Sequence, residues 1–323
     1  MNRKILRELT HNAYSFLSLE NSLYKQWVFR YTFLEMEKDL GTKGDVTTNS
    51  LFPQKKDVKA KIIARDDGVL AGIEEVKYFL VDSNPDFKPK IGGSFKVEFN
   101  KKDGDFIKKG DVIMGIEADV HDLLTVERVV LNLMMRMSGV ATFTHEIVGI
   151  VKNSDVLIVP TRKTLWGLLD KRAVLIGGGG THRLNLSDAI LIKDTHLDVL
   201  GHDFDKALDK IVSANLSVRF VEIEVSSGED ALKCSESLNK YLKNGKLNLI
   251  GAILFDNLSV KEVAEIIENI RRKGFYDEIL FESSGGITEK NVLDYAKTGV
   301  DIISMGCLTN EVSSLDMTMK IDL

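Results

Sequence analysis

Residues 156–194 read VLIVPTRKTLWGLLDKRAVLIGGGGTHRLNLSDAILIKD and contain the pattern that predicts the fold. Two apolar runs, VLIVP (156–160) and AILIK (189–193), stand at the ends of this stretch. Their length and branched aliphatic side chains are typical of buried strands. Positive charge follows the first run directly, at Arg162 and Lys163. A strand that ends in charged side chains is the unit expected of a β/α enzyme.

The same pattern recurs toward the C-terminus. Four further apolar runs predict strands: RFVEIEV (219–225), LIGAILF (249–255), EILFE (278–282) and DIISM (301–305). Amphipathic helical patterns separate most of the runs, at residues 204–214, 229–243, 259–273 and 288–297. This alternation predicts a parallel sheet covered by helices. Neither a G-x-G-x-x-G fingerprint nor a P-loop is present, so an open or complete β/α barrel fits better than a dinucleotide-binding fold.

The N-terminal part has a different order of helical and strand-like patterns. Helical patterns at residues 2–19 and 21–40 lead into short strand-like runs, which are KAKIIAR (59–65), GVLAG (68–72), GSFKVEF (93–99) and GDVIMGI (110–116). Two more helical patterns, at residues 122–137 and 141–152, precede the first strand of the repeating part. These features predict a small α+β domain before the barrel.

Composition argues against several classes of protein. The apolar fraction of 44% and the charged fraction of 28% are ordinary for a globular chain. A net charge of −5 and a pI near 5.8 disfavour binding to nucleic acid or membrane surfaces. Cys234 and Cys307 have no metal-type spacing, so we expect neither a disulfide framework nor a zinc site. With no run of about 18 apolar residues and no signal-peptide core, we expect a cytoplasmic protein.

Polar residues follow all six predicted strands. They are Thr161-Arg162-Lys163, Lys193-Asp194, Glu224, Asp256-Asn257, Glu282-Ser283-Ser284-Gly285-Gly286 and Gly306. In a β/α barrel the carboxyl ends of the strands form one active-site mouth, so these residues should converge. Glu224 and Asp256 could hold Mg²⁺, whereas the cations of residues 162–193 would bind anions. The last two loops are where barrels often bind phosphate.

Several of these features have structural alternatives. The glycine run 177–180 could serve as a hinge or a close-packing site without touching a ligand. Glu222 lies on the same strand face as Glu224 and could pair with an internal cation. We expect Lys171-Arg172 to lie on a solvated helix face. Surface positions are also expected for four histidines, namely His11, His121, His145 and His202.

The block TRKT–GGGG–HR–LIKD–H within residues 161–196 closely resembles the quinolinate phosphoribosyltransferase family, also called carboxylating nicotinate-nucleotide pyrophosphorylase. The similarity extends over almost the whole chain through GDVTT (44–48), RDDGVLAG (65–72), ERVVLNLMMRMSGVAT (127–142), ESSGGI (282–287) and TGVDIISMGCLT (298–309). GDVTT alone is a weak signal, whereas the spaced block is specific.

The resemblance implies an α/β fold in which an N-terminal α+β sandwich-like domain packs on an incomplete β/α barrel. We place the N-terminal domain at 1–138, the catalytic barrel at 139–308, and at 309–323 a tail that packs back on the N-terminal domain. The implied enzyme is a pentosyltransferase of NAD biosynthesis. It converts quinolinate and phosphoribosyl pyrophosphate into nicotinate mononucleotide, pyrophosphate and CO₂, requires magnesium, and forms a homodimer or a higher oligomer.

The resemblance also assigns roles by position. The residues implied to bind the two carboxylates of quinolinate are Arg128, Arg162, His182, Arg183 and Lys193, with Arg128 contributed by the neighbouring subunit. Those implied to bind the phosphoribosyl donor are Lys163, Glu224, Asp256, Ser284, Gly285 and Gly306. Glu224 and Asp256 would hold magnesium directly or through water. Lys193, Glu224 and Asp256 are the expected catalytic residues, because positive charge grows on the ribose while the acid is clamped for attack.

The chain departs from the family pattern beside the acid pocket, at Pro160, Leu165-Trp166, Leu169 and Thr195. A paralogous phosphoribosyltransferase acting on another pyridine or small acid is therefore an alternative, although the retained His182-Arg183 and Lys193 favour a diacid. A Schiff-base aldolase with Lys193 as nucleophile is a second alternative. A non-catalytic phosphate-binding barrel is the third.

Overall fold

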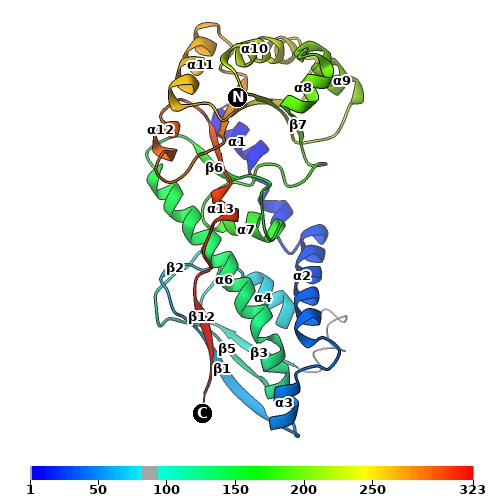
Figure 1. Ribbon diagram of the computed structural model, residues 1–323, viewed down its shortest axis with the longest axis vertical. Coiled ribbons are helices and arrows are strands. Elements are labelled where there is room, and N and C mark those ends of the chain that lie inside the picture. The colour runs from blue at the N-terminus through cyan, green and yellow to red at the C-terminus, as the bar shows by residue number, and fades with distance from the viewer. Residues whose placement is uncertain (1, 82–93, 323) are drawn as a thin grey trace. The chain divides into compact units, whose positions relative to one another are not determined.

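The structure, a computed structural model, describes residues 2–81 and 94–322 of the 323-residue chain. The chain, traced in Figure 1, forms two compact units, each built from separate segments. The unit that we name the barrel unit comprises Met1–Ala13, Glu146–Leu165 and Gly179–Glu311. The second, the antiparallel unit, comprises Tyr14–His145, Trp166–Gly178 and Val312–Leu323. Both differ from the predicted boundaries, since each unit takes segments from distant parts of the chain.

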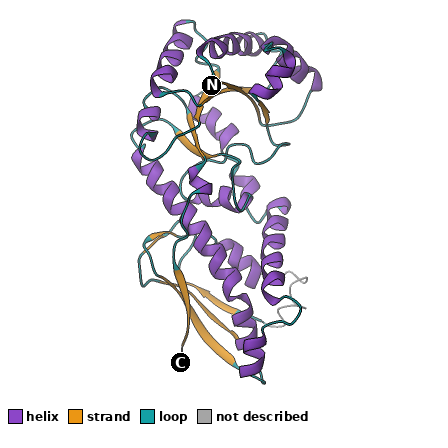
Figure 2. Cartoon of the chain, viewed as in Figure 1, coloured by secondary structure: helices purple, strands orange, loops and turns teal. Residues whose placement is uncertain are grey.

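A six-stranded parallel sheet organises the barrel unit (Figure 2). Its order is β6-β11-β10-β9-β8-β7, and all six strands were predicted. Their bounds are β6 Leu157–Pro160, β7 Ile190–Ile192, β8 Phe220–Val225, β9 Ile250–Asp256, β10 Ile279–Ser284 and β11 Ile302–Met305. Within the described residues β6 and β7 each pair on one side only, so the sheet stays open. The α/β class with an incomplete barrel is thereby confirmed.

Helices connect these strands. They are α8 Asp194–Leu200, α9 Phe204–Ala214, α10 Gly228–Lys243, α11 Val260–Arg272, α12 Val292–Ala296 and α13 Cys307–Asn310. Local capping explains where the predicted ones begin: Ser259 and Glu262 form a reciprocal capping box at α11. Helix α12 is shorter than the predicted range 288–297, because Asn291 and Thr288 form a turn before it.

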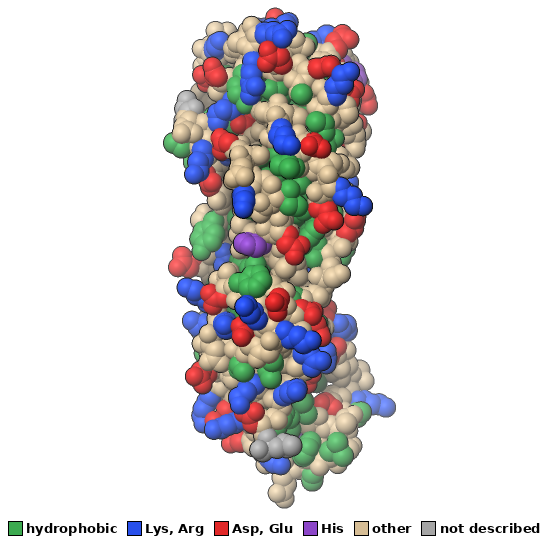
Figure 3. All heavy atoms as spheres, turned by 90° about the vertical axis from the view of Figure 1, so that its left-hand side faces the viewer, with side chains coloured by type: hydrophobic (Ala, Val, Ile, Leu, Met, Phe, Trp, Pro, Cys, Tyr) green, Lys and Arg blue, Asp and Glu red, His purple; other side chains and the backbone are tan. Residues whose placement is uncertain are grey.

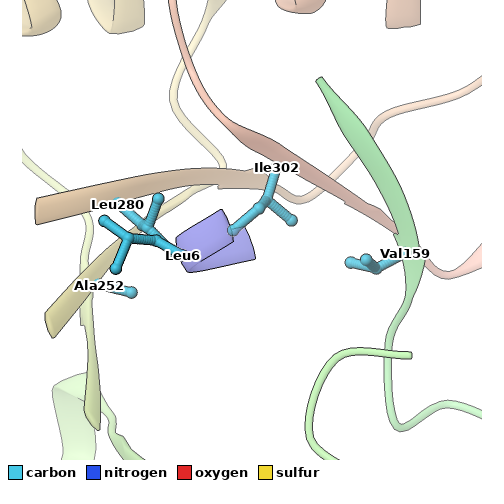
Figure 4. Close-up of a cluster of buried hydrophobic side chains, with 5 residues drawn as sticks. All are labelled: Leu6, Val159, Ala252, Leu280 and Ile302. Atoms are coloured by element: carbon cyan, nitrogen blue, oxygen red, sulfur yellow. The ribbon is translucent and has the colours of Figure 1, made fainter. Parts of the chain in front are cut away.

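Helix α1 (Arg3–His11) belongs to the barrel unit. Leu6 is buried with Val159, Ala252, Leu280 and Ile302, near the amino ends of the strands (Figure 4). Arg3 pairs with Asp301, and Arg7 pairs with Asp155. The predicted domain 1–138 placed these residues elsewhere, since a helical pattern alone does not reveal which sheet it covers. The predicted helix 2–19 also ends early, and a 3₁₀ turn follows at Tyr14–Leu17.

The antiparallel unit contains a four-stranded sheet of order β12-β1-β5-β3. The strands are β1 Asp57–Ala64, β3 Lys96–Phe99, β5 Val112–Asp119 and β12 Met317–Asp322, beside a short pair of β2 Gly68–Val69 and β4 Phe106–Ile107. Its helices include α2 Ser22–Leu40, α3 Val46–Leu51, α4 Ile73–Leu80 and α7 Leu168–Ile176. Strand β12 comes from the tail 309–323 and pairs antiparallel with β1. The run GSFKVEF begins at Gly93, outside the described residues.

A single helix, α6 (Val120–Ile150), replaces the two helices predicted at 122–137 and 141–152. Ser138 and Gly139, which lie between the two predicted helices, both make packing contacts inside the continuous helix. A Cβ on Gly139 would lie 2.2 Å from the carbonyl oxygen of Ser313. The Oγ of Ser138 accepts a hydrogen bond from the amide of Ala71 at 2.9 Å. Glycine inside a helix therefore marks a close approach of another segment here.

The prediction of a solvated face at Lys171-Arg172 is wrong. These residues of α7 are 2% and 8% exposed, respectively. The Nε of Arg172 lies 3.9 Å from Oε1 of Glu75, and the same oxygen accepts a hydrogen bond from the hydroxyl of Tyr24 at 2.6 Å. Charged side chains can be buried when such partners are present, and these partners are distant in sequence.

The surface is otherwise mixed. On the face drawn in Figure 3, basic and acidic side chains intermingle, as expected for a modest net charge of −5. In the described part of the chain, no helix combines the length and the apolar character needed to cross a membrane.

Candidate active site

A cavity of about 560 Å³ lies at the carboxyl ends of the strands in the barrel unit. It collects the side chains that follow the strands, because parallel strands all end at one edge. The predicted site residues that line it are Arg162, Lys163, His182, Arg183, Lys193, Glu224, Asp256, Ser284, Gly285 and Gly306. Arg128 is the exception. It lies on α6 in the antiparallel unit, with its side chain 62% exposed and 3.1 Å from Glu127.

Arg162 and Arg183 line the cavity together with Lys163 and Lys193. Burial lowers the pKa of Arg183, and the charge of Arg162 lowers it further. The Nε of Arg183 is buried, and no protein atom accepts a hydrogen bond from it. Neighbouring like charges with an unused buried donor favour an anionic ligand. This is the arrangement that the sequence predicted for carboxylate binding.

Two carboxylates occupy another part of the cavity, Glu224 at the end of β8 and Asp256 at the end of β9. Burial raises the pKa of Glu224; the charge of Lys193 opposes this rise, and that of Asp256 adds to it. Asp256 Oδ2 also accepts a hydrogen bond from the side chain of Asn257 at 2.7 Å. Carboxylate oxygens from two neighbouring strand ends suit a hard divalent cation such as Mg²⁺. The residues present therefore fit the predicted metal.

The loops after β10 and β11 expose backbone to the cavity. Gly285 and Gly286 have φ values of 90° and 61°, in the region that side chains rarely adopt. A Cβ on Gly285 would lie 2.2 Å from Oδ1 of Asn257, so glycine is required there. Gly306 precedes α13, where a Cβ would meet only ordinary contacts. The two loops at which the sequence predicted phosphate binding therefore both line the cavity.

At the base of the cavity, a buried quartet joins His11, His182, Glu222 and Glu282, of which His182 and Glu282 line the cavity. The Nε2 of His182 lies 3.1 Å from Oε2 of Glu222 and 3.3 Å from Oε1 of Glu282. The Nε2 of His11 lies 3.2 Å from Oε2 of Glu282. Sequence reasoning placed His11 at the surface, which is wrong, because the last residue of α1 stacks on Phe220 with ring centroids 4.7 Å apart. Glu222 contacts His182 inside the barrel unit, so the predicted alternative of an internal ion pair is confirmed for this residue.

Electrostatics within this quartet are strongly coupled. Burial lowers the pKa of His182, but the charges of Glu282 and Glu222 outweigh it and raise the pKa to about 9. Burial also raises the pKa of Glu222, as does the charge of Glu282. For Glu282 itself, the neighbouring histidines outweigh burial and hold the pKa well below its usual range. Within the quartet, Glu282 therefore favours its ionised form and His182 its protonated form.

The glycine run 177–180 does not line the cavity. Its glycines allow close packing of other segments rather than contact with a ligand. A Cβ on Gly180 would lie 2.4 Å from the carbonyl oxygen of His11, and one on Gly177 would lie 2.4 Å from that of Ala141. Gly178 has a φ of 94°. The structural alternative weighed for this motif is therefore the one observed.

Comparisons with known proteins agree over nearly the whole chain. The quinolinate phosphoribosyl transferase N-terminal domain model matches residues 45–138, and the C-terminal domain model matches residues 140–320. A probable carboxylating nicotinate-nucleotide pyrophosphorylase of Methanothermobacter thermautotrophicus is 35% identical, covering 86% of this chain and 93% of the relative. That of Bacillus subtilis is 35% identical, covering 94% and 95%. The nicotinate-nucleotide pyrophosphorylase structure from Ehrlichia chaffeensis has 33% identity and a TM-score of 0.75, covering 93% and 98%.

Proposed function

Since the chain belongs to the quinolinate phosphoribosyltransferase family, we propose that it transfers the phosphoribosyl group of phosphoribosyl pyrophosphate to quinolinate with decarboxylation. The products are nicotinate mononucleotide, pyrophosphate and CO₂, in NAD biosynthesis. One observation carries the proposal. A single cavity presents Arg162 and Arg183 together with the carboxylates Glu224 and Asp256, which matches a dianionic acid and a charged donor.

The cations would bind and orient the acid. Arg162, Arg183 and Lys193 all reach the cavity, and their fixed charges match the two carboxylates of quinolinate. Holding the acid in this way aims its pyridine nitrogen at the anomeric carbon of the donor, which lowers the entropic part of the barrier. The buried and unpaired Nε of Arg183 gains a hydrogen-bond acceptor only when an anion arrives.

The carboxylates would act on the donor. As the nitrogen–carbon bond forms and pyrophosphate leaves, positive charge grows on the ribose, and Glu224 and Asp256 are placed to stabilise it. They would also hold Mg²⁺, which when bound would supply positive charge to offset that of the leaving pyrophosphate. The alkylated pyridinium then accepts the electron pair of the breaking carbon–carboxylate bond, CO₂ departs, and the ring carbon takes a proton from water. No nucleophilic side chain is needed for these steps.

We also propose that the chain forms a homodimer or a higher oligomer in which Arg128 enters the neighbouring active site. A cytoplasmic location is part of the same proposal. The support is that the Arg128 side chain is exposed and lies outside the barrel unit. Sedimentation would measure the assembly. Mixing two inactive variants, Arg128→Ala and Lys193→Ala, should restore part of the activity, because a mixed dimer has one intact site. A strictly monomeric chain would contradict this part.

Departures from the family pattern do not change the acid-binding side chains. Pro160, Leu165, Trp166 and Leu169 do not line the cavity. Trp166 packs against Tyr31 with ring centroids 4.7 Å apart, in the antiparallel unit. The structure therefore gives no support to an altered acid, and quinolinate remains the proposed substrate.

The deciding experiment is a turnover assay with magnesium, phosphoribosyl pyrophosphate and quinolinate, with nicotinate as a parallel acid. Release of nicotinate mononucleotide and CO₂ from quinolinate alone is expected. Product from nicotinate, with none from quinolinate, would assign the chain to a paralogous acid. Borohydride trapping of a substrate on Lys193 would instead support the aldolase.

A further inference from the structure

Asn257 occupies the turn between the end of β9 and the start of α11. It lines the cavity and directly follows Asp256, the last residue of β9. Only two residues, Asn257 and Leu258, lie between β9 and the N-cap residue of α11. The hydroxyl of Tyr295 donates a hydrogen bond to the carbonyl of Leu258 at 2.9 Å, which holds the end of this turn. The chain must therefore change direction within two residues, directly beside a carboxylate of the site.

The backbone of Asn257 is left-handed. Its φ is 55°, a value that asparagine adopts more readily than most residues. Successive side chains of an extended strand point to opposite faces, so an extended Asn257 would point away from Asp256. With this φ, its Nδ2 instead donates a hydrogen bond to Oδ2 of Asp256 at 2.7 Å. The turn therefore brings a neutral donor to the carboxylate at the end of β9.

The same residue contacts the loop after β10. Its backbone amide donates a hydrogen bond to the carbonyl of Ser284 at 2.9 Å, next to the last pair of β9 and β10, which joins Asp256 to Ser284. Its Oδ1 lies so close to Gly285 that a Cβ added there would be 2.2 Å away. Asn257 thus contacts both the carboxylate expected to hold Mg²⁺ and the loop expected to bind phosphate.

The hydrogen bond to Asp256 has a consequence for the direction of its carboxylate. A carboxylate can rotate broadly about the bond that joins it to Cβ. A hydrogen bond to Oδ2 narrows this rotation and thereby sets the direction of Oδ1. Because the amide is neutral, it does so without cancelling the negative charge that a divalent cation or a positive ribose would require.

We propose that Asn257 is a positioning residue of the donor site. Its Nδ2 sets the direction of the Asp256 carboxylate, and its backbone joins that carboxylate to the loop that contains Ser284 and Gly285. This inference rests on the proposed function and deepens it, because Asp256 is expected to act on the phosphoribosyl donor and its Mg²⁺. The competing explanation is that asparagine serves only the left-handed turn.

Two substitutions separate the side-chain amide from the turn. Asn257→Gly keeps the left-handed φ and removes the amide. Asn257→Asp keeps the shape and tolerates this φ, but it places a second negative charge against Asp256. We expect the KM for phosphoribosyl pyrophosphate to rise by about tenfold in the glycine variant and by more in the aspartate variant, as for a lost hydrogen bond to a charged group. The KM for quinolinate should stay within about twofold in both.

The pH dependence of Asn257→Asp is a readout that a role in the turn alone would not change. At low pH the two neighbouring carboxylates would share one proton, and the protonated form again donates a hydrogen bond. The KM for phosphoribosyl pyrophosphate, relative to wild type at the same pH, should therefore fall toward the wild-type value between about pH 8 and about pH 5. No such recovery is expected for Asn257→Gly, which has no group to protonate.

Asn215 is the matched control. It has a φ of 45°, is the C-cap residue of α9, is exposed, and does not line the cavity. Asn215→Gly and Asn215→Asp should leave the KM for phosphoribosyl pyrophosphate unchanged, so they report the effect of replacing a left-handed asparagine alone. If one Asn257 variant does not fold, the other still decides, because both lack the amide donor.

Calorimetry of phosphoribosyl pyrophosphate with Mg²⁺, in the absence of an acid, would measure donor binding directly. Binding should be about tenfold weaker in Asn257→Gly than in wild type; if the donor does not bind without an acid, its KM decides. Wild-type values in both Asn257 variants would overturn the inference and leave asparagine with the turn alone. A wild type that binds the donor without turning over quinolinate would remove the proposed acid instead, and the binding contrast would still decide the role of Asn257.

Discussion

Replacing Gly180 with alanine should destabilise the barrel unit by about 2–4 kcal/mol. The new Cβ would lie 2.4 Å from the carbonyl oxygen of His11, and 2.9 and 3.0 Å from the side chains of Leu157 and Val159. The carbonyl belongs to the backbone at the end of α1, so it cannot rotate away. Overpacking of this kind costs about 1–3 kcal/mol.

Relief of the clash would strain two hydrogen bonds. The amide of Gly180 donates to the carbonyl of Ile158 at 2.8 Å, and that of Thr181 donates to the carbonyl of His11 at 2.7 Å. Each such bond contributes about 1 kcal/mol net. Reduced freedom of the unfolded chain offsets about 0.4–1 kcal/mol of the loss. Because the two bonds are weakened rather than lost, the net cost falls in the range stated above.

Urea denaturation followed by circular dichroism would measure the change. Gly149→Ala is the control, because Gly149 lies in α6, is exposed, and a Cβ added to it would have no other heavy atom within 4 Å. Alanine there should be neutral or stabilising by about 0.5–1 kcal/mol. If Gly180→Ala matched this control, the close packing of α1 against the glycine run would be refuted.

Three further outcomes are expected. Lys193→Ala should abolish quinolinate turnover and leave the circular dichroism spectrum unchanged; unaltered turnover would contradict the clamp. Arg136→Leu should destabilise by about 3–5 kcal/mol in urea denaturation, because it removes the charged partner of the buried Asp170 carboxylate, which Arg136 contacts at 3.0 and 3.2 Å. Burial and the charge of Glu75 raise the pKa of Asp103 from 3.8 to about 7, so unfolding free energy should fall as pH rises through that window. Asp103→Asn should flatten this dependence, and an unchanged profile would exclude Asp103 as its source.

The sequence was sufficient for features that depend on local pattern and topology. Short aliphatic runs separated by amphipathic stretches located all six strands of the parallel sheet. Because parallel strands end at one edge, the residues after them could be predicted to meet, and the cavity contains them. The prediction needed no knowledge of side-chain partners.

Features that depend on partners distant in sequence were not predictable. His11 and Arg172 look like ordinary polar positions on helices, yet both are buried against carboxylates from other elements. The two helices predicted at 122–137 and 141–152 are one helix, and the segment that packs against Gly139 between them comes from the C-terminal tail. In each case the deciding contact forms only when the fold brings the segments together.

For Glu222 and Glu224, the sequence pattern predicts the strand face of each side chain but not its distance from the cavity. Their spacing of two places both on one face of β8, but they stand about 7 Å apart along the strand. Glu222 therefore meets His182 below the cavity, whereas Glu224 reaches the level of Lys193 and Asp256. Helix α1 packs near the amino ends of the strands and brings His11 to Glu282, so the partners of Glu222 lie at that level. Only the carboxylate above that level is open to a metal or a donor, so two glutamates on one strand face have separate roles.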